Sequence, residues 1–547
     1  MSDSKRVFIY DCTLRDGTQG ERVSLSVEDK INVAQKLDAF GVDYIEGGWP
    51  GSNQKDVEFF KRVRDLSWDT SKIAAFGSTR HHKNSVEEDP NIAALLEADT
   101  PVVTVVGKSW DFHVERALGT TLEENLRMVQ DSVAYLKEKG KEVIFDAEHF
   151  FDGYASNPRY AKSVIRTARE AGADWVVLCD TNGGNLPSSI ESLTHQLNPE
   201  FPFLGIHTHN DCEMGVSNTI AAVQAGARMV QGTINGYGER SGNANLCSVI
   251  PVLELKLGKE TVGPEKLKTL TSLAYFVSET ANLVLPNNLP FVGKSSFAHK
   301  GGLHVSGINK DPRTYEHMDP DAVGNNRRVL VSDLSGRSNL LYKVREFGDL
   351  DEKELDLKAL LEHIKKLEYE GYQFEGADGS LKLLFRKFGK DQEQPFEFKG
   401  FRVLVDQNHA GQFVSEATVK IRVDGVDEHV ASDGNGPVHA LDCAVKKALV
   451  RFFPEIEEIR LIDYKVRVLD AQSGTAAKVR VLIESTDGHR TWTSMGVSSN
   501  VMEASWQAII DGVLYKLVFP SNGEEQPSAV REEKETEEER KKETIKQ

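Results

Sequence analysis

Short apolar runs alternate with amphipathic segments through the first half of the chain, and this alternation limits the possible folds. The apolar runs lie at residues 6–13, 44–50, 73–79, 102–108, 142–150, 175–181, 203–210 and 229–235. Helix-like segments separate them, and those at 27–41, 121–140 and 158–172 each end in glycine, a common residue just beyond a helix. Strand–helix repetition on this scale predicts a (β/α)₈ TIM barrel. A doubly wound open sheet is the alternative, but no GxGxxG motif follows the first strand, which disfavours its dinucleotide-binding form.

The rest of the chain shows two further patterns. With 547 residues the chain is too long for one hydrophobic core. Residues 1–262 are assigned to the barrel, and residues 263–395, with their charged helical segments, are predicted to form a helical arm. Alternating strands at 416–426 and 476–488 each lead into another strand, a polar turn and a helix. Residues 396–520 are therefore predicted to form an α+β domain with two pseudo-symmetric βββα halves.

Charge and cysteine content narrow the class of protein. The net charge of −18 argues against nucleic acid as a partner, because phosphate binding needs a basic face. The five cysteines are scattered and form no CxxC pair, which fits a reducing compartment. No run approaches the length of a membrane span and the first residues lack an apolar signal segment, so we expect a cytoplasmic protein with no membrane partner. Residues 521–547 are almost all charged or polar and are predicted to be disordered.

Ionisable side chains gather where the predicted strands end. In a barrel of this kind the active site lies at the C-terminal ends of the strands. The residues at these ends are Asp11, Arg15 and Asp16; Asp146, Glu148 and His149; Asp180, Thr181 and Asn182; His207, His209, Asn210 and Asp211; and Glu239, Arg240 and Asn243. Such clustering on one rim has little packing rationale, so it predicts a functional site.

The segment GIHTHND, residues 205–211, indicates a metal site. Alternate residues of a strand share a face, so His207 and His209 are predicted to aim their imidazoles at one point. Two imidazoles and one carboxylate form a site for a divalent metal with open positions. Asp16 is our candidate for the carboxylate, and the amide oxygen of Asn243 can complete the set. An isolated HxH is equally often a polar strand end; the matching strand ends favour a metal, with Mg, Mn and Zn all compatible.

Two charged residues beside this set have two interpretations each. Arg15 presents a rigid fork of donors that can stabilise an oxyanion next to a metal, although a structural pair with Asp16 also fits. Glu148 can act as a base or orient a bound molecule. It can equally be a carboxylate that positions His149 or a ligand histidine.

Several long segments resemble known enzymes. DCTLRDGTQGE (11–21), HTHND (207–211) and GYGERSGNANL (236–246) resemble the signature segments of the 2-isopropylmalate, homocitrate and citramalate synthases. FAHKGGLH (297–304) and SDGNGPVHALDCAVKKAL (432–449) resemble the post-barrel and regulatory segments of the same family. Four more segments look most like the citramalate synthase branch: FGSTRHH, GKSWDFHV, FDAEHFFDGY and LCDTNGG. Asn182 stands where the isopropylmalate branch usually has Val-Gly.

The resemblance implies a Claisen-type condensation of acetyl-CoA, as co-substrate, with pyruvate to give (R)-citramalate and CoA. It implies that the divalent metal is held by four residues: Asp16, His207, His209 and Asn243. By the same resemblance, Arg15 stabilises the alkoxide, Thr181 binds the carboxylate of the oxo acid, and Glu148 lies near the reacting centre. His304 matches a histidine that helps to activate the acetyl group, and Tyr315 matches a tyrosine nearby.

The resemblance also implies partners and regulation. In relatives the arm reaches over the neighbouring subunit's barrel, so a homodimer is expected. The C-terminal domain is expected to bind an amino-acid effector, isoleucine for this branch, at a helix start that contains Gly434 and Gly436. A purely dimerising role for this domain is the alternative.

Three other functions are alternatives to this condensation. The closest is a 2-isopropylmalate synthase, which takes 2-oxoisovalerate and responds to leucine. An acyl-CoA lyase of the same superfamily is disfavoured because lyases carry a cysteine in a Gly-Cys-Pro loop after strand 8, where this chain has GYGERSGNAN. A non-enzymatic amino-acid sensor is disfavoured by the intact set of Arg15, Asp16, His207, His209 and Asn243.

Overall fold

The computed structural model describes residues 5–348, 350–389, 394–407, 411–469 and 476–519. The segment 521–547, predicted to be disordered, lies outside the described residues.

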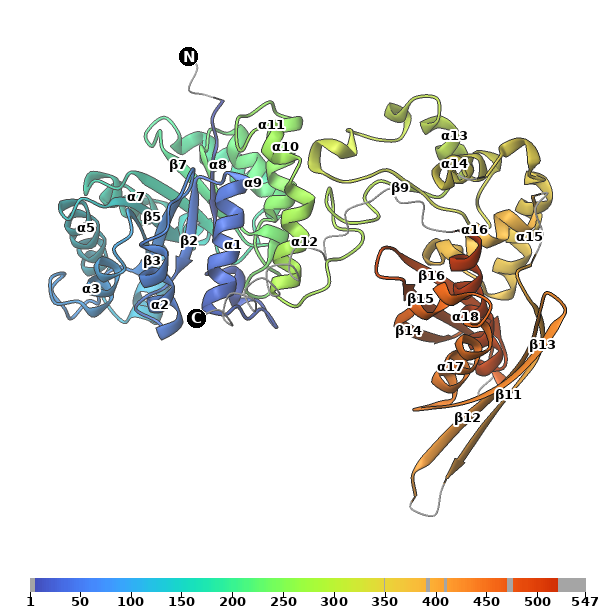
Figure 1. Cartoon of the computed structure of the whole chain (residues 1–547). Helices are drawn as coiled ribbons and strands as arrows, with labels where there is room; N and C mark the ends of the chain where they lie inside the picture. The colour runs from blue at the N-terminus through green and yellow to red at the C-terminus, as the bar shows by residue number, and fades with distance from the viewer. Residues whose placement is uncertain (1–4, 349, 390–393, 408–410, 470–475, 520–547) are drawn as a thin grey trace. The chain divides into compact units, whose positions relative to one another are not determined.

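The first part of the chain forms a closed barrel of parallel strands, as the sequence predicts (Figure 1). The strands are β1 (Phe8–Asp11), β2 (Tyr44–Gly48), β3 (Lys72–Ser78), β4 (Val102–Lys108), β5 (Glu142–Glu148), β6 (Trp175–Asp180), β7 (Leu204–Thr208) and β8 (Met229–Gly232). Each strand pairs with the next, and β1 closes the barrel by pairing with β8 from Phe8↔Met229 to Asp11↔Gly232. Because all strands run the same way, their C-terminal ends share one rim.

Helices surround the barrel strands. They are α1 (Val27–Phe40), α2 (Gln54–Val63), α3 (Pro90–Glu97), α4 (Asp111–His113), α5 (Leu122–Glu138), α6 (Phe150–Ser156), α7 (Pro158–Glu170), α8 (Pro187–Leu197), α9 (Gly215–Gln224) and α10 (Leu246–Leu255), with short turns η1 (Gly17–Gln19), η2 (Val114–Leu118) and η3 (Ile234–Gly236). Local sequence sets their ends. The Ser26 side chain accepts a hydrogen bond from the Asp29 N–H to start α1, and Gly41, with φ of 96°, ends it.

Large side chains fill the barrel below its rim. Tyr10, Ile144, Val177 and Met229 are fully buried and form part of one interior cluster. This apolar floor leaves the polar strand ends as the chemically active surface of the barrel.

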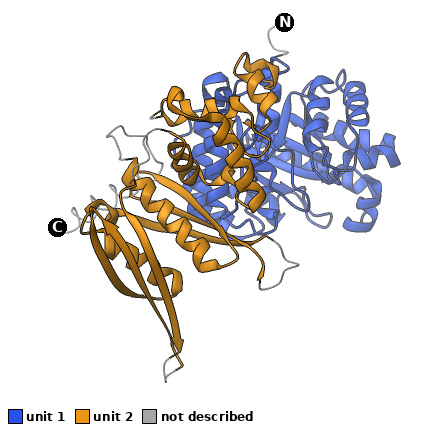
Figure 2. Ribbon diagram, turned by 90° about the vertical axis from the view of Figure 1, so that its right-hand side faces the viewer, with its two compact units in different colours: residues 1–297, 318–327 blue, residues 298–317, 328–547 orange. Residues whose placement is uncertain are grey.

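The chain divides into two compact units (Figure 2). Unit 1 contains residues 1–297 and 318–327, and unit 2 contains residues 298–317 and 328–547. Unit 1 therefore also holds α11 (Pro264–Leu267), α12 (Leu270–Thr280) and η5 (Pro320–Val323). Helix α12 packs on α1 and contributes buried leucines to the barrel's outer core. The arm predicted to start at residue 263 thus shares its first helices with the barrel unit.

Unit 2 begins with helices around a very small sheet. Its elements are β9 (Ala298–His299), α13 (Gly302–Ile308), η4 (Pro312–Thr314), β10 (Arg328–Val329), α14 (Arg337–Phe347), η6 (Glu352–Glu354), α15 (Leu357–Glu370), η7 (Phe374–Gly376) and α16 (Asp378–Lys387). Strands β9 and β10 pair in parallel over two residues each, too short to give a sequence pattern.

The C-terminal part of unit 2 confirms the predicted repeat. One half contains β11 (Glu397–Gln407), β12 (Phe413–Val423), β13 (Val426–Gly434) and α17 (Pro437–Leu449); the other contains η8 (Pro454–Glu458), β14 (Arg460–Val468), β15 (Val479–Thr486), β16 (Thr491–Ser498) and α18 (Val501–Val518). Each half is a three-stranded antiparallel sheet followed by a helix. Buried residues of both halves, such as Ile421, Leu441 and Ile509, join one core.

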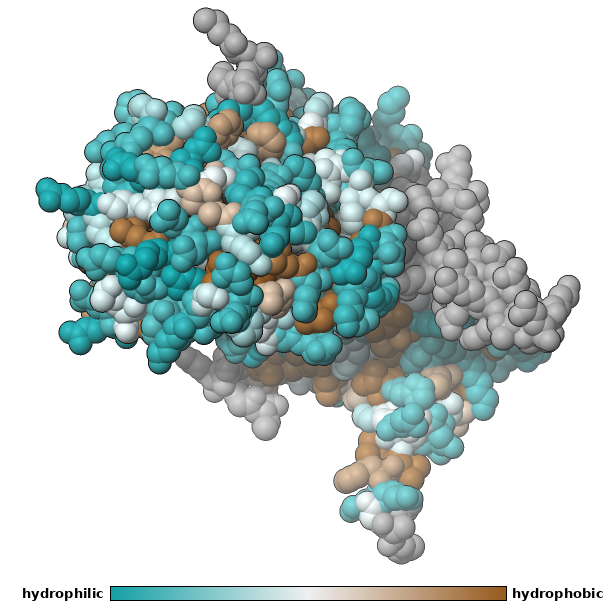
Figure 3. Space-filling view, turned by 90° about the vertical axis from the view of Figure 1, so that its left-hand side faces the viewer, coloured by the Kyte–Doolittle hydropathy of each residue, from teal (hydrophilic) through white to brown (hydrophobic). Residues whose placement is uncertain are grey.

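One face of the molecule, which includes part of unit 1, is mostly hydrophilic (Figure 3). Apolar residues on this face are scattered singly or in small groups. Among the described residues, no helix combines the length and the apolarity that crossing a membrane requires.

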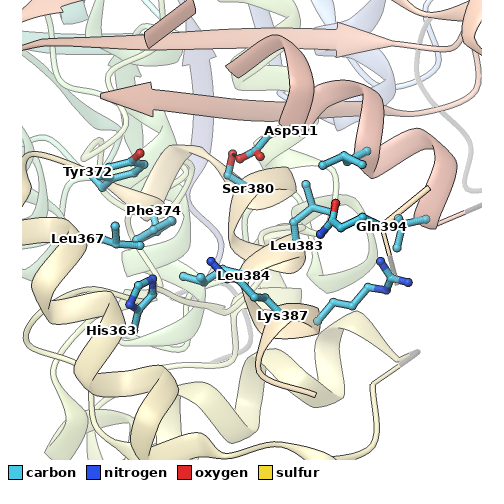
Figure 4. A pocket seen from close by; sticks show the side chains of 13 residues that line it. His363, Leu367, Tyr372, Phe374, Ser380, Leu383, Leu384, Lys387, Gln394 and Asp511 are labelled. Carbon is cyan, nitrogen blue, oxygen red and sulfur yellow. Dashed lines mark hydrogen bonds between the residues drawn. The ribbon is translucent and has the colours of Figure 1, made fainter. Parts of the chain in front are cut away.

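A cavity of about 420 Å³ lies inside unit 2, between α15, α16 and α18 (Figure 4). Leu367, Phe374 and Leu384 line its apolar side, and Asp511 of α18 points toward Ser380 of α16. The Ser380 hydroxyl donates to the Asp511 carboxylate at 2.5 Å. Burial raises the pKa of Asp511 to about 6, despite this hydrogen bond and the nearby charge of Lys387.

The raised pKa of Asp511 predicts that Asp511→Asn increases the stability of the folded protein, and that the increase depends on pH. The native carboxyl holds its proton more tightly than the unfolded one, so its favourable contribution is complete below pH 3.8 and is lost as the pH rises through about 6. Because one pKa unit corresponds to about 1.4 kcal/mol, the variant is expected to be about 1–3 kcal/mol more stable than the wild type at pH 8. Thermal denaturation at pH 4 and pH 8 measures this, with exposed Asp424→Asn as the control. An equal change in melting temperature at both values contradicts the prediction.

Candidate metal centre

Two histidines converge at the end of β7. His207 belongs to the strand, His209 follows it, and each is 5% exposed. Their Nε2 atoms lie 3.3 Å apart. At most one proton fits between two nitrogens at this distance. Burial, and then the neighbouring His207, lower the pKa of His209 to about 3, so this ring is neutral at physiological pH.

Asp16 lies close to the two imidazole rings, although it comes from the start of the barrel sequence. It follows β1, and its Oδ2 lies 3.8 Å from His207 Nε2. One ligand atom from each of Asp16, His207 and His209 lies within 4.8 Å of the others. Burial alone would raise the pKa of Asp16, but Arg15 and the two imidazoles lower it to about 2. The cluster therefore offers a carboxylate and at least one neutral imidazole.

Asn243 completes the cluster from the loop after β8. Its Nδ2 donates to Asp16 Oδ1 at 2.8 Å and to the Tyr237 carbonyl at 3.1 Å. Its Oδ1 is buried and has no hydrogen-bond partner among the residues that the structure describes. A Cβ on Gly238 would lie 2.2 Å from Asn243 Nδ2, so only glycine allows the loop to pass this close. A bridge between His209 and Asn243 ties the loops after β7 and β8 together.

The donor set fits a divalent cation. A buried amide oxygen without a partner costs free energy, and a cation at this point would compensate it. Neutral imidazole nitrogens suit Zn and Mn, while the carboxylate and amide oxygens also accept Mg. The four residues that the sequence singled out as ligands thus lie together in unit 1.

Arg15 lies against this cluster in a fixed orientation. Its Nη1 donates to Asp16 Oδ2 at 2.9 Å, and its Nε donates to Glu46 Oε2 at 2.5 Å. The guanidinium carbon is 3.8 Å from the centre of the Phe76 ring. Burial would lower the pKa of Arg15, but Glu46 and Asp16 raise it well above its ordinary value. Arg15 is thus a permanent cation with part of its fork toward the cluster.

Sequence reasoning missed Glu46. This residue of β2 is fully buried and accepts hydrogen bonds from Arg15 and from the Tyr10 hydroxyl, the latter at 2.8 Å. A carboxylate inside the apolar run YIEGGWP was the available signal, because buried charges are rare unless they are paired.

A series of buried hydrogen bonds begins at Nδ1 of His207, the ring nitrogen that does not face His209. His207 Nδ1 lies 2.8 Å from Gln231 Oε1, and Gln231 Nε2 donates to Asp146 Oδ1 at 2.9 Å. Burial, followed by the charge of Glu46, raises the pKa of Asp146 to about 8. Gln231 was also missed, although it is a polar residue inside the short apolar run of β8.

Three other residues at the strand ends have partners outside the cluster of Asp16, His207 and His209: Glu148, His149 and Thr181. The carboxylate of Glu148 forms an ion pair with Lys108. The hydroxyl of Thr181 accepts from the backbone N–H of His149 at 2.8 Å. His149 adopts a left-handed conformation with φ of 55°, unusual outside glycine, and its ring lies 4.2 Å from that of His113.

Comparisons with known proteins agree with this architecture. Residues 6–277 match the HMGL-like family, residues 291–371 the homocitrate synthase post-HMGL domain-like family, and residues 375–517 the LeuA allosteric (dimerisation) domain. The (R)-citramalate synthase of Aquifex aeolicus is 55% identical over 94% of this chain and 98% of its own. That of Geobacter sulfurreducens is 52% identical over 93% and 97%. The chain belongs to the (R)-citramalate synthase family.

The branch predicted within the wider family is confirmed. A probable 2-isopropylmalate synthase of Methanopyrus kandleri is only 32% identical over 93% of this chain and 98% of its own. The resemblance of the segments FGSTRHH and LCDTNGG to the citramalate synthase branch therefore predicted the family of this chain correctly.

Two further residues that were predicted to belong to the site of this citramalate synthase family member lie in unit 2. His304 belongs to α13 and Tyr315 follows η4, and their rings stack with centroids 4.1 Å apart and an interplanar angle of 21°. Both side chains are exposed. Both residues lie within residues 291–371, which match the homocitrate synthase post-HMGL domain-like family, and the structure places their rings in contact.

The predicted effector residues lie at the start of α17. Gly434 ends β13, Gly436 precedes the helix, and Pro437 is its first residue. Gly436 is the N-cap residue and has no side chain to cap the helix, and His439 Nδ1 accepts from the Asn435 N–H at 3.0 Å. At the corresponding place in the other half, Asn500 caps α18 by accepting from the Met502 N–H at 2.9 Å. The two halves therefore differ at the point where a carboxylate would bind.

Proposed function

We propose that this protein is an (R)-citramalate synthase, an acyltransferase that condenses acetyl-CoA with pyruvate to give (R)-citramalate and CoA. The observation that carries the proposal is the 55% identity over nearly the whole chain to an enzyme of that name. The buried cluster of Asp16, His207 and His209 supports it, because this chemistry needs a polarised carbonyl.

The bonds formed and broken in this reaction assign tasks to the chain's residues. The acetyl methyl group loses a proton, a carbon–carbon bond forms to the carbonyl carbon of pyruvate, and the carbonyl oxygen gains a proton. Water then cleaves the thioester and releases the CoA thiol. A divalent ion held by Asp16, His207, His209 and Asn243 supplies Lewis acidity and a fixed position for the oxo acid.

Arg15 provides the charge that the developing oxyanion needs. Its guanidinium is already held by Glu46 and Asp16, so it requires no reorganisation during the reaction. Thr181 is proposed to donate to the pyruvate carboxylate through its hydroxyl, which already accepts one hydrogen bond from His149. Glu148 is proposed to lie near the reacting centre, with Lys108 balancing its charge.

His304 and Tyr315 are proposed to act on the acetyl group. Their exposed, stacked rings are available to a substrate, and His304 is proposed to help remove the methyl proton. In this proposal a homodimer assembles the site from the barrel of one subunit and the arm of its partner.

The C-terminal domain is proposed to join the two subunits and to bind an amino-acid effector. Its match to a dimerisation domain supports the first role, and so do the exposed apolar side chains of its strands, among them Phe413, Val414 and Ile462. Isoleucine is proposed as the effector, with its carboxylate near Gly434 and Gly436 at the start of α17.

A panel of 2-oxo acids tests the proposed substrate. CoA release is expected to show a kcat/KM at least about 10-fold higher for pyruvate than for 2-oxoisovalerate, since each extra methylene in a closed pocket changes specificity by about 10–200-fold. Chiral analysis of the product is expected to give (R)-citramalate. Preference for 2-oxoisovalerate would instead indicate a 2-isopropylmalate synthase. Isoleucine and leucine, added separately to the same assay, test the proposed effector.

A further inference from the structure

Gln231 occupies an unusual position for a neutral polar residue. It lies on β8, is fully buried inside the barrel, and bridges the side chains of two other strands. On one side is His207 of β7, with Nδ1 at 2.8 Å from Gln231 Oε1. On the other is Asp146 of β5, whose Oδ1 accepts from Gln231 Nε2 at 2.9 Å. Each polar atom of the amide therefore has a specific partner.

The orientation of this amide decides which nitrogen of His207 carries the proton. A carbonyl oxygen can only accept, so the contact with Gln231 Oε1 requires a proton on His207 Nδ1. A neutral imidazole has one proton, which leaves Nε2 with a free lone pair. That same Nε2 faces His209 and Asp16 in the cluster.

In the structure the amide turns its oxygen toward His207 and its NH₂ toward Asp146, which is 3% exposed. If the amide were turned over, its NH₂ would face His207 Nδ1. The proton of His207 would then move to Nε2 and block the lone pair that the cluster needs. The direction in which Gln231 points therefore sets the tautomer of His207.

We propose that Gln231 is a positioning residue for the metal site, which holds His207 as the Nδ1–H tautomer and so keeps Nε2 ready to bind the ion. This inference rests on the proposed metal-binding role of Asp16, His207 and His209. In metal sites generally, partners of this kind orient the ligand ring, and their loss lowers metal affinity by about 10–100-fold.

Binding of Mn²⁺ alone to the full-length protein tests the proposal. Electron paramagnetic resonance of the free ion gives the Kd without any assay of activity. Gln231→Leu, which keeps the approximate volume but removes both polar atoms, is expected to weaken Mn²⁺ binding by about 10–100-fold. Gln231→Met serves the same purpose if the leucine variant fails to fold. Gln231→Glu retains an acceptor for His207 Nδ1 and is expected to bind Mn²⁺ within about 3-fold of the wild type.

The variants separate failure of this inference from failure of the metal site. His207→Ala is the reference: if it does not weaken Mn²⁺ binding, the proposed metal site is wrong and the inference falls with it. If His207→Ala weakens binding but neither apolar variant does, only the role of Gln231 is overturned. The same holds if Gln231→Glu is as weak as Gln231→Leu, because the retained acceptor for His207 Nδ1 would then not preserve Mn²⁺ binding. Thermal denaturation of each variant confirms that the compared proteins are folded.

Discussion

Replacing Asp16 by asparagine is expected to lower the affinity for a divalent ion by more than about 100-fold, and to abolish metal-dependent condensation at micromolar metal. The expected size follows from the proposed role of this carboxylate as a metal ligand. Loss of a residue that merely orients a ligand lowers metal affinity by about 10–100-fold, and loss of the ligand itself is expected to lower it further. Asparagine keeps the shape of the side chain but removes the negative charge from a site that is 4% exposed.

The same replacement leaves Arg15 with one carboxylate instead of two. Glu46 still accepts from Arg15 Nε, so the guanidinium stays paired and the barrel is expected to fold. Mn²⁺ titration and CoA release, each at rising metal concentration, measure the two effects. Asp427→Asn is the matched control, since Asp427 also pairs with an arginine, Arg422 at 2.6 Å, but on an exposed hairpin. Retention of metal affinity in Asp16→Asn would contradict the assignment.

Arg15→Lys is expected to lower kcat by about 100–1000-fold while Mn²⁺ affinity changes much less. Removing one preorganised donor to a developing oxyanion has an effect of this size. Lysine keeps the charge but lacks the planar fork with which the guanidinium contacts Glu46 and Asp16 at once, 3.8 Å from the centre of the Phe76 ring. The ammonium is therefore expected to take another position than the one the oxyanion needs.

Steady-state kinetics with pyruvate and acetyl-CoA, together with Mn²⁺ titration, measure the Arg15 prediction. Arg22→Lys is the control, because the side chain of Arg22 is 82% exposed and lies 4.0 Å from the Glu21 carboxylate. A small change in kcat would show that Arg15 serves only as a structural partner of Asp16. An equal loss of metal affinity and kcat would show that it acts through the ion.

Periodicity was enough to predict the barrel, the repeat and the rim. Alternation of apolar runs and helices is a local property, so a reader of the sequence can find β1 to β8 and the βββα halves without coordinates. The proximity of the proposed metal ligands is predictable for the same reason: the strand ends of a parallel barrel share a rim, and the segment HTHND places two imidazoles there.

The contacts inside the barrel could not be predicted in this way. Glu46, Gln231 and Asp146 come from β2, β8 and β5, and which of them meet depends on how the closed barrel aligns its strands. A buried polar residue signals a partner but does not name it. The pairing of His304 with Tyr315 depends on the turn between α13 and η4, where neither residue follows a repeating pattern.

Closure of the barrel by β1 and β8 has a consequence for biosynthesis. The hydrogen bond from Asn243 to Asp16 spans 227 positions of sequence, and β1 stays without its β8 partner until residue 232 has been made. Such distant pairing forms late, because the intervening chain must first be ordered. A nascent or truncated polypeptide that ends before residue 243 therefore lacks Asn243, one of the four residues proposed to hold the ion, so the proposed site is complete only after the whole barrel has been synthesised.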